Sequence, residues 1–264
     1  MIEDLKQIAE GAGREILRFY ERDLIAEQKA DKSPLTLADQ ASHDFIIAAL
    51  RDLDPSIPIL SEEAAEIPYA DRKCWERFWL VDPMDGTKEF IKRTGEFTVN
   101  IALVEATNPV IGMIYVPVQK LFYWADRANG AHKAGNGTGA VRIRCRKADL
   151  AQLGIVASRD HAGPAVKELL ARFPSAETRS MGSSLKFCLV AEGKADVYLR
   201  DVPTMEWDTA AAQCIVEAAG GSVQLLNSDT LAYNKKVLRN PAVVTLGDPS
   251  ISAFLFSNAD LAVD

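Results

Sequence analysis

Cysteine and histidine are both scarce in this sequence, which limits the chemistry that it can perform. The four cysteines are isolated, with no C-x-x-C pair and no histidine at ligand spacing, so we expect reduced thiols rather than a disulfide framework or a zinc site. They are Cys74, Cys145, Cys188 and Cys214. The three histidines, His43, His132 and His161, lie in no motif, and there is no G-x-S-x-G. A serine hydrolase is therefore unsupported.

The sequence also lacks long apolar runs and an excess of basic residues. No segment approaches the roughly 18 apolar residues of a membrane-spanning helix, and the first residues do not form a signal-peptide pattern. The formal net charge of −7 argues against a surface for duplex nucleic acid, although bound cations can still attract a small anionic substrate. We expect a cytoplasmic protein, either free or attached peripherally to the inner membrane.

What remains is an ordinary globular composition, 48% hydrophobic and 25% charged. Apolar spacing predicts helices over 5–19, 37–53, 163–173, 185–192 and 208–219. It predicts strands over 57–60, 78–81, 97–104, 110–116, 121–125, 154–158, 195–199, 223–226 and 242–246. AGNGTG at 134–139 lacks a complete G-x-G-x-x-G and predicts a hairpin turn. We expect two α/β lobes, 1–145 with most of the candidate ligands and 146–264.

The segment WLVDPMDGT at 79–87 carries the clearest chemical signal. An apolar strand leads to Asp82, and Pro83, which cannot donate a ladder hydrogen bond, is expected to end the pairing. Asp85 follows across a tight turn that leads into a short helix. The two carboxylates suit a hard divalent cation, and the free N–H groups of the helix suit a phosphate. Oxygen ligands without Cys or His favour Mg²⁺ over zinc.

Each acidic residue also has a simpler explanation when it is taken alone. Asp82 and Asp85 can cap a turn and a helix, and Glu62 lies in an acidic run after an apolar strand. Asp208 opens an apolar helix as an N-cap would, and Asp39 follows a threonine at capping-box spacing. The complete D-P-x-D-G-T motif weakens the capping explanation for Asp82 and Asp85. Glu62, Asp208 and Asp39 support a function only in combination with that motif.

In combination, four segments resemble those of the inositol monophosphatase superfamily of Mg²⁺-dependent, Li⁺-sensitive phosphatases. They are SPLTLAD at 33–39, SEE at 61–63, DPMDGT at 82–87, and WDTAA at 207–211 with a later Gly-Gly at 220–221. The continuations DGTKEFI at 85–91 and GEFTVN at 95–100 resemble the CysQ branch, the 3′(2′),5′-bisphosphate nucleotidases. The resemblance implies a layered αβαβα sandwich of the inositol monophosphatase and fructose-1,6-bisphosphatase type.

The resemblance also implies the metal ligands. Glu62, Asp82 and the backbone carbonyl of Met84 would hold one Mg²⁺, while Asp82, Asp85 and Asp208 would hold a second, in a site of two or three ions. The second ion would stabilise the leaving 3′-oxygen.

Catalytic and substrate-binding roles follow from the same resemblance. Asp39 and Thr87 would position and deprotonate the attacking water, with Glu62 also in the catalytic set, and Gly86 and Thr87 would bind the scissile phosphate. The substrate-contacting loop would comprise Gly182, Ser183, Ser184 and Lys186. A mobile lid is expected at 29–33, poorly ordered without metal.

The expected substrate is 3′-phosphoadenosine 5′-phosphate, hydrolysed to AMP and phosphate by a monomer or homodimer. The second phosphate of this substrate needs further cationic side chains. The candidates are Lys88, Lys92, Arg93, Arg159, Lys186 and Arg200. Of these we favour Lys186. Two alternatives stay open: an inositol monophosphatase or sugar phosphatase, and a nucleotide-binding regulator without catalysis.

Overall fold

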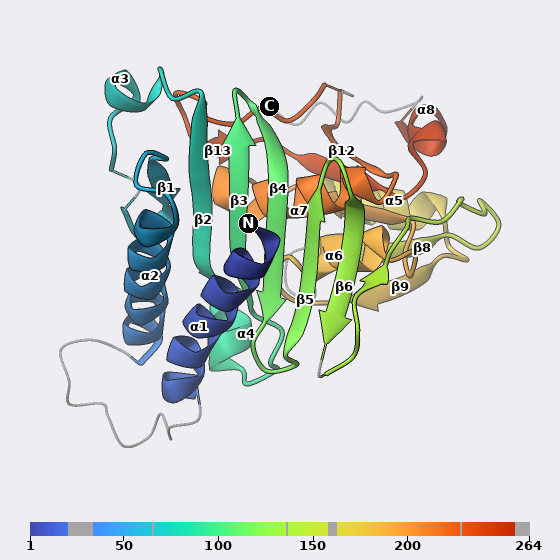
Figure 1. The fold of residues 1–264 in the computed structure, drawn as a ribbon. Helices are drawn as coiled ribbons and strands as arrows, with labels where there is room; N and C mark the ends of the chain where they lie inside the picture. The colour runs from blue at the N-terminus through green and yellow to red at the C-terminus, as the bar shows by residue number, and fades with distance from the viewer. Residues whose placement is uncertain (21–33, 65, 136, 158–162, 228, 257–264) are drawn as a thin grey trace.

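Helices and sheets alternate in five layers (Figure 1). The computed structural model describes residues 1–20, 34–64, 66–135, 137–157, 163–227 and 229–256. The first layer contains α1 (Ile2–Tyr20) and α2 (Pro34–Leu53), the third α6 (Leu185–Ala191) and α7 (Glu206–Ala218), and the fifth α5 (Pro164–Arg172) and α8 (Ser252–Phe256). The αβαβα prediction is confirmed. The expected lid at 29–33 and Arg159 lie outside the described residues.

The larger sheet keeps its seven strands in sequence order. Its strands are β1 (Ile59–Ser61), β2 (Arg77–Asp85), β3 (Thr98–Glu105), β4 (Asn108–Val116), β5 (Leu121–Asp126), β6 (Gly130–Gly135) and β7 (Val141–Arg142). Only β1 and β2 pair in parallel in this described sheet. Because helices cover both faces, β3 is buried from Thr98 to Val104 and reads as a continuous apolar strand rather than an alternating one. The hairpin turn was predicted at 134–139, but β6 continues to Gly135 before the chain returns antiparallel as β7.

The smaller sheet has the order β12 (Ser222–Leu225), β14 (Val243–Leu246), β10 (Val197–Arg200), β8 (Gly154–Ala157) and β9 (Glu177–Ser180). A two-stranded pair, β11 (Thr204–Met205) and β13 (Arg239–Asn240), lies before and after α7 in the chain. The remaining described elements are η1 (Glu62–Ala64), α3 (Tyr69–Arg72), α4 (Thr87–Ile91) and η2 (Pro249–Ile251). The two larger sheets meet across α6 and α7, and one core cluster contains residues from Leu60 to Val243. The lobe boundary at 145/146 stays a prediction.

A glycine on β4 sets how closely α7 approaches the larger sheet. A Cβ on Gly112 would lie 2.3 Å from the carbonyl oxygen of Ala211, so only glycine allows this contact. The close packing fixes α7 against β3 and β4 and thereby fixes the side chains at its N-terminal end. No helix in the described ranges is long and apolar enough to cross a membrane.

Candidate active site

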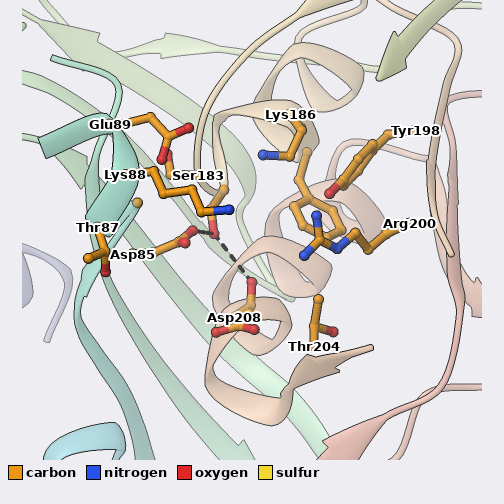
Figure 2. A pocket seen from close by; sticks show the side chains of 13 residues that line it. Asp85, Thr87, Lys88, Glu89, Ser183, Lys186, Tyr198, Arg200, Thr204 and Asp208 are labelled. Atoms are coloured by element: carbon orange, nitrogen blue, oxygen red, sulfur yellow. Dashed lines mark hydrogen bonds between the residues drawn. The ribbon is translucent and has the colours of Figure 1, made fainter. Parts of the chain in front are cut away.

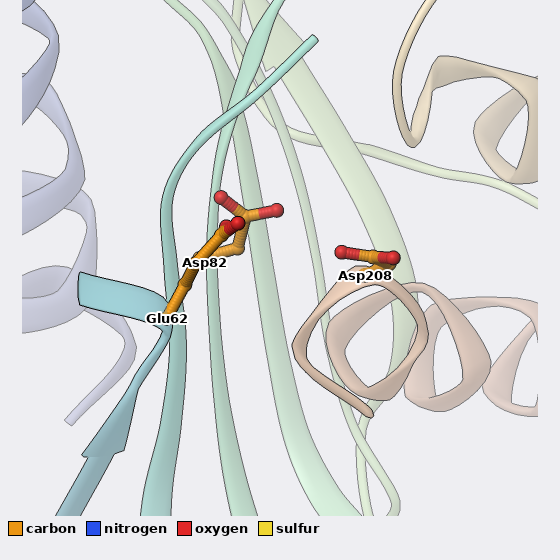
Figure 3. Close-up of side chains that lie close together, drawn as sticks. All are labelled: Glu62, Asp82 and Asp208. Carbon is orange, nitrogen blue, oxygen red and sulfur yellow. The ribbon is translucent and has the colours of Figure 1, made fainter. Parts of the chain in front are cut away.

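Three carboxylates from different elements converge at one edge of the larger sheet (Figure 3). Oxygen atoms of Glu62, Asp82 and Asp208 all lie within 4.8 Å of one another. The first two come from parallel neighbours, because Ser61 of β1 pairs with Val81 of β2. Glu62 and Asp82 therefore follow this pair at equivalent positions of adjacent strands, which explains why two acids 20 positions apart meet.

Pro83 does not end β2, contrary to the sequence prediction. Pairing with β3 resumes at Asp85, opposite Thr98, after a register shift between Asp82 and Asp85. A bulge takes the residue without an N–H out of the regular ladder, so the strand tolerates it. The carbonyl of Pro83 accepts a hydrogen bond of 2.8 Å from the buried Ser42 hydroxyl of α2, and this bond holds the bulge in place.

Met84 is buried in the same bulge, and its N–H donates to Oδ1 of Asp82 at 3.0 Å. Gly86 follows with φ +102°, and a Cβ there would lie 3.1 Å from Cα of Phe97. This left-handed residue turns the chain directly into α4, which begins at Thr87 as expected. The DPMDGT segment thus places its carboxylates beside the first N–H groups of a helix.

The simplest interpretation of the sequence made Asp208 the N-cap of α7, but the structure does not place it there. The helix begins at Glu206, and Oδ2 of Asp208 accepts a hydrogen bond of 2.8 Å from the N–H of Met205. The buried Glu206 holds this end by accepting from the backbone N–H groups of Asn234 and Lys235 and from Nζ of Lys235. One oxygen of Asp208 is therefore committed to the helix, while the side chain faces Glu62 and Asp82.

Asp39 does not form a capping box with Thr36, because α2 begins at Pro34 and contains both residues. Burial, and to a smaller extent the charges of Glu63 and Glu62, together raise the pKa of Asp39 to about 8. Its capping explanation is thus replaced by a position beside the acidic cluster.

The remaining cluster carboxyls are perturbed in the same direction. Burial, then the charge of Asp85, raises the pKa of Asp208 to about 7. Burial and the neighbouring Asp85 and Glu62 raise the pKa of Asp82 well above its ordinary value, and burial raises that of Glu62. Ionised carboxylates this close repel one another, so the set is stabilised either by protons or by bound cations. Oxygen-only ligands at this spacing fit a hard divalent ion.

Asp85 is held by a hydrogen-bond relay that the sequence interpretation missed. The Ser184 hydroxyl lies 2.8 Å from Oδ2 of Asp85, and Nδ2 of Asn100 donates to Oγ of Ser184 at 2.9 Å. Since the hydroxyl has one proton, it donates to the carboxylate and accepts from the amide. Ser184 is only 1% exposed, and its hydroxyl also lies 3.3 Å from the backbone carbonyl oxygen of Asp208. The available signal was Asn100, a polar residue in a strand that is apolar on both sides.

A pocket of about 310 Å³ opens beside Asp85 and Asp208 (Figure 2). Its lining comprises Asp85, Gly86, Thr87, Lys88, Glu89, Ser183, Ser184, Lys186, Phe187, Tyr198, Arg200, Thr204 and Asp208. The structure thus brings together the expected phosphate-binding residues, most of the substrate loop and three of the six candidate cations. Lys92 and Arg93 do not line it. Tyr198 and Thr204 were not predicted, because no local pattern distinguishes them from other strand residues.

Comparison with known proteins agrees with this architecture. Residues 1–251 match the model of the inositol monophosphatase family. The chain is 46% identical to the 3′(2′),5′-bisphosphate nucleotidase CysQ of Salmonella typhimurium over 89% of this chain and 95% of that protein. It superimposes on the crystal structure of CysQ from Bacteroides thetaiotaomicron with a TM-score of 0.82 and 44% identity, over 90% of this chain and 94% of that one. Superposition on the structure of an inositol monophosphatase from Zymomonas mobilis gives a TM-score of 0.78 and 25% identity, over 97% of this chain and 96% of that one. The chain therefore belongs to the inositol monophosphatase family, among its CysQ members.

Proposed function

We propose that this protein is a Mg²⁺-dependent 3′(2′),5′-bisphosphate nucleotidase that hydrolyses 3′-phosphoadenosine 5′-phosphate to AMP and phosphate. The observation that carries the proposal is the convergence of Glu62, Asp82 and Asp208 beside a pocket whose opposite wall is cationic. An acidic cluster alone would suit many metal sites. A neighbouring pocket with Lys186 and Arg200 suits a substrate with two anionic groups, and the relative from Salmonella typhimurium is named a 3′(2′),5′-bisphosphate nucleotidase.

Residues of the cluster would hold the metal, and those of the pocket would hold the substrate. Glu62, Asp82, Asp85, Asp208 and the carbonyl of Met84 are the proposed Mg²⁺ ligands. When bound, Mg²⁺ would neutralise the negative charge of the phosphoryl oxygens and of the leaving oxygen.

The protein's own groups would orient the reactants around that charge. The first N–H groups of α4, at Gly86 and Thr87, would bind the oxygens of the scissile phosphate. Asp39 and the Thr87 hydroxyl would hold a water molecule in line with the 3′-oxygen, and Asp39, with Glu62 nearby, would accept its proton. The water oxygen would bond to phosphorus as the bond between phosphorus and the ribose 3′-oxygen breaks, and the 3′-oxygen would take up a proton from solvent.

Parallel kinetics test the proposal directly. Phosphate release with Mg²⁺ would be measured from 3′-phosphoadenosine 5′-phosphate and inositol 1-phosphate, and the two values of kcat/KM compared. We expect the nucleotide to be preferred by at least about 100-fold, since hydrogen bonds to a second anionic group are each worth about tenfold or more. A preference for inositol phosphate would overturn the nucleotidase assignment and favour the first alternative. Release from neither would favour another phosphomonoester or a regulator without catalysis.

Two earlier expectations stay predictions. One is a cytoplasmic location, either free or peripheral to the inner membrane, and the other is an oligomeric state of monomer or homodimer. We expect no binding of duplex nucleic acid, because the chain carries a net charge of −7.

Ser184→Ala should weaken metal binding more than substrate binding. Without the hydroxyl, Asp85 loses its donor and the buried Asn100 amide loses its acceptor. Loss of such a partner commonly lowers metal affinity 10- to 100-fold, so we expect the Mg²⁺ concentration for half-maximal activity to rise at least about tenfold. The measurement is a Mg²⁺ titration of the initial rate at saturating substrate.

Ser183→Ala is the matched control for that titration. Ser183 lies next in the chain and lines the pocket, and its buried hydroxyl has no partner among the described residues. We expect it to change KM for the substrate while the Mg²⁺ requirement stays within about twofold of the wild type. Equal Mg²⁺ requirements in the two variants would show that the relay through Ser184 does not position Asp85.

A further inference from the structure

Helix α2 lies alongside β1 and β2, the two strands of the larger sheet that pair in parallel (Figure 1). Two consecutive residues of this helix each make a side-chain hydrogen bond to one of these strands. The Ser42 hydroxyl donates to the carbonyl oxygen of Pro83 in the bulge of β2, and Nδ1 of His43 lies 2.9 Å from Oγ of Ser61 at the end of β1. Adjacent positions of one helix therefore hold the ends of both strands.

The end of β1 has few other constraints. The strand is three residues long and lies at the edge of its sheet, so among the described residues it pairs with β2 alone. Ser61 is 1% exposed, and the contact with His43 is its one side-chain hydrogen bond within the described part of the chain. The next residue is Glu62, where the chain passes from the strand into η1. Because the strand end lacks a second neighbour, the position of Glu62 depends on contacts outside the sheet.

The properties of His43 suit this task. Its half-buried side chain lines a cavity of about 280 Å³ together with Ser61 and apolar residues such as Ile47. Burial lowers the pKa of His43, although the charges of Asp44 and Glu63 oppose the shift, so the ring is neutral at pH 7. A neutral imidazole has one N–H donor and one acceptor nitrogen, so Nδ1 can pair with the Ser61 hydroxyl in either tautomer.

We infer that His43 is a positioning residue of the metal site, which fixes Glu62 through its neighbour Ser61. The bond from Ser42 fixes the bulge of β2, which carries the other proposed ligands of the ion at Glu62. Since both bonds start from adjacent residues of one helix, they set the distance between the two groups of ligands. Asp39 lies four residues before His43 on the same helix. The inference rests on the proposed function and deepens it, because it concerns the affinity for the proposed Mg²⁺.

Two variants of similar shape test whether the hydrogen bond of His43 matters. Asn can place an oxygen or nitrogen atom where Nδ1 lies, whereas Leu has nearly the shape of Asn but no polar atom. Tm would be measured against Mg²⁺ concentration without substrate, since a ligand of the folded state raises Tm by mass action. We expect His43→Leu to need about tenfold more Mg²⁺ than the wild type for an equal rise in Tm, and His43→Asn to stay within about threefold. Ser42→Ala should resemble His43→Leu.

A purely structural role would rank the two variants in the opposite order. Leu is the better helix former and suits an apolar cavity, so the metal-free Tm of His43→Leu should equal or exceed that of His43→Asn. Ile47→Ala is the matched control, because it enlarges the same cavity without removing a hydrogen bond. It should lower the metal-free Tm, while its Mg²⁺ requirement stays within about twofold of the wild type.

Several results would overturn the inference. Equal Mg²⁺ requirements in the wild type and His43→Leu, equal losses in His43→Leu and His43→Asn, or an equal loss in Ile47→Ala would each show that this hydrogen bond does not position Glu62. A wild-type Tm that does not respond to Mg²⁺ would overturn the metal site and the inference with it. If Mg²⁺ raises the Tm but the wild type hydrolyses neither 3′-phosphoadenosine 5′-phosphate nor inositol 1-phosphate, the proposed function fails, while the comparison of variants still decides the role of His43.

Discussion

Asp82→Asn is expected to lower kcat/KM for phosphate release by at least about 10³-fold. Asp82 is the fully buried member of the cluster, and it lies within reach of both Glu62 and Asp208. The substitution keeps the size of the side chain and an oxygen that can accept from the N–H of Met84, but removes the charge that both proposed ions need. Stabilisation of transition-state charge by metal ions is worth several kcal/mol, and each 1.4 kcal/mol corresponds to a factor of ten in rate.

The fold should survive the same substitution. A neutral amide removes one of several mutually repelling carboxylates, so the metal-free variant should melt at or above the temperature of the metal-free wild type. Circular dichroism and thermal unfolding without Mg²⁺ check this, and Asp71→Asn, an exposed acid on α3, is the control for the loss of one charge. More than a tenth of wild-type activity in Asp82→Asn at saturating Mg²⁺ would refute the proposed metal role.

The sequence predicted the elements whose apolar pattern is strong. The helix at 208–219 and the strands at 97–104 and 110–116 correspond closely to α7, β3 and β4, because burial on all sides leaves a long apolar run. The runs at 57–60 and 78–81 predicted strands that lead to Glu62 and Asp82, although β2 continues beyond Asp82 to Asp85. Strands β9, β11 and β13 were missed, since they are two to four residues long and mostly polar, and only their neighbours in space determine them.

The errors at the site have a common origin in contacts between distant segments. Pro83 ends a strand by local rules, but a bulge and the Ser42 hydroxyl of α2, 41 residues away, keep the pairing going. The Ser184 relay joins residues 84 and 99 positions apart, which no local spacing reveals. The residue types in a motif therefore indicate which side chains can bind a metal. The strand register and the packing of layers determine which other side chains hold those ligands in position.

Asp39→Asn should separate catalysis from stability. As the proposed acceptor of the proton from water, Asp39 should contribute about 10²- to 10³-fold to kcat, which is typical of a positioned general base. In the metal-free protein the same carboxyl is unfavourable once ionised, because its pKa is raised from 3.8 to about 8 by burial and by Glu63 and Glu62. The variant should therefore lose activity and gain metal-free stability at high pH.

The pH window follows from the direction of this shift. The folded state binds the proton of Asp39 more tightly than the unfolded state, so the free energy of unfolding falls as pH rises from about 4 to about 8. The amide introduced by Asp39→Asn cannot ionise, so the variant loses this part of the pH dependence. Without Mg²⁺ at pH 8.5, we expect Asp39→Asn to melt at least about 3 °C above the wild type, since 1 kcal/mol shifts Tm by about 2–4 °C in domains of this size. At pH 5 the difference should be smaller.

Asp44→Asn provides the control on the same helix. Asp44 is exposed, and one of its oxygens accepts a hydrogen bond of 2.8 Å from the nearby Gln40 amide, so its neutralisation should change neither kcat nor the pH dependence of Tm appreciably. Saturating Mg²⁺ should raise the Tm of the wild type at pH 8.5 and narrow its difference from Asp39→Asn, because bound cations favour the ionised carboxyl. If Asp39→Asn kept wild-type kcat while showing the predicted gain in stability, Asp39 would be a member of the electrostatic cluster without a role in proton transfer.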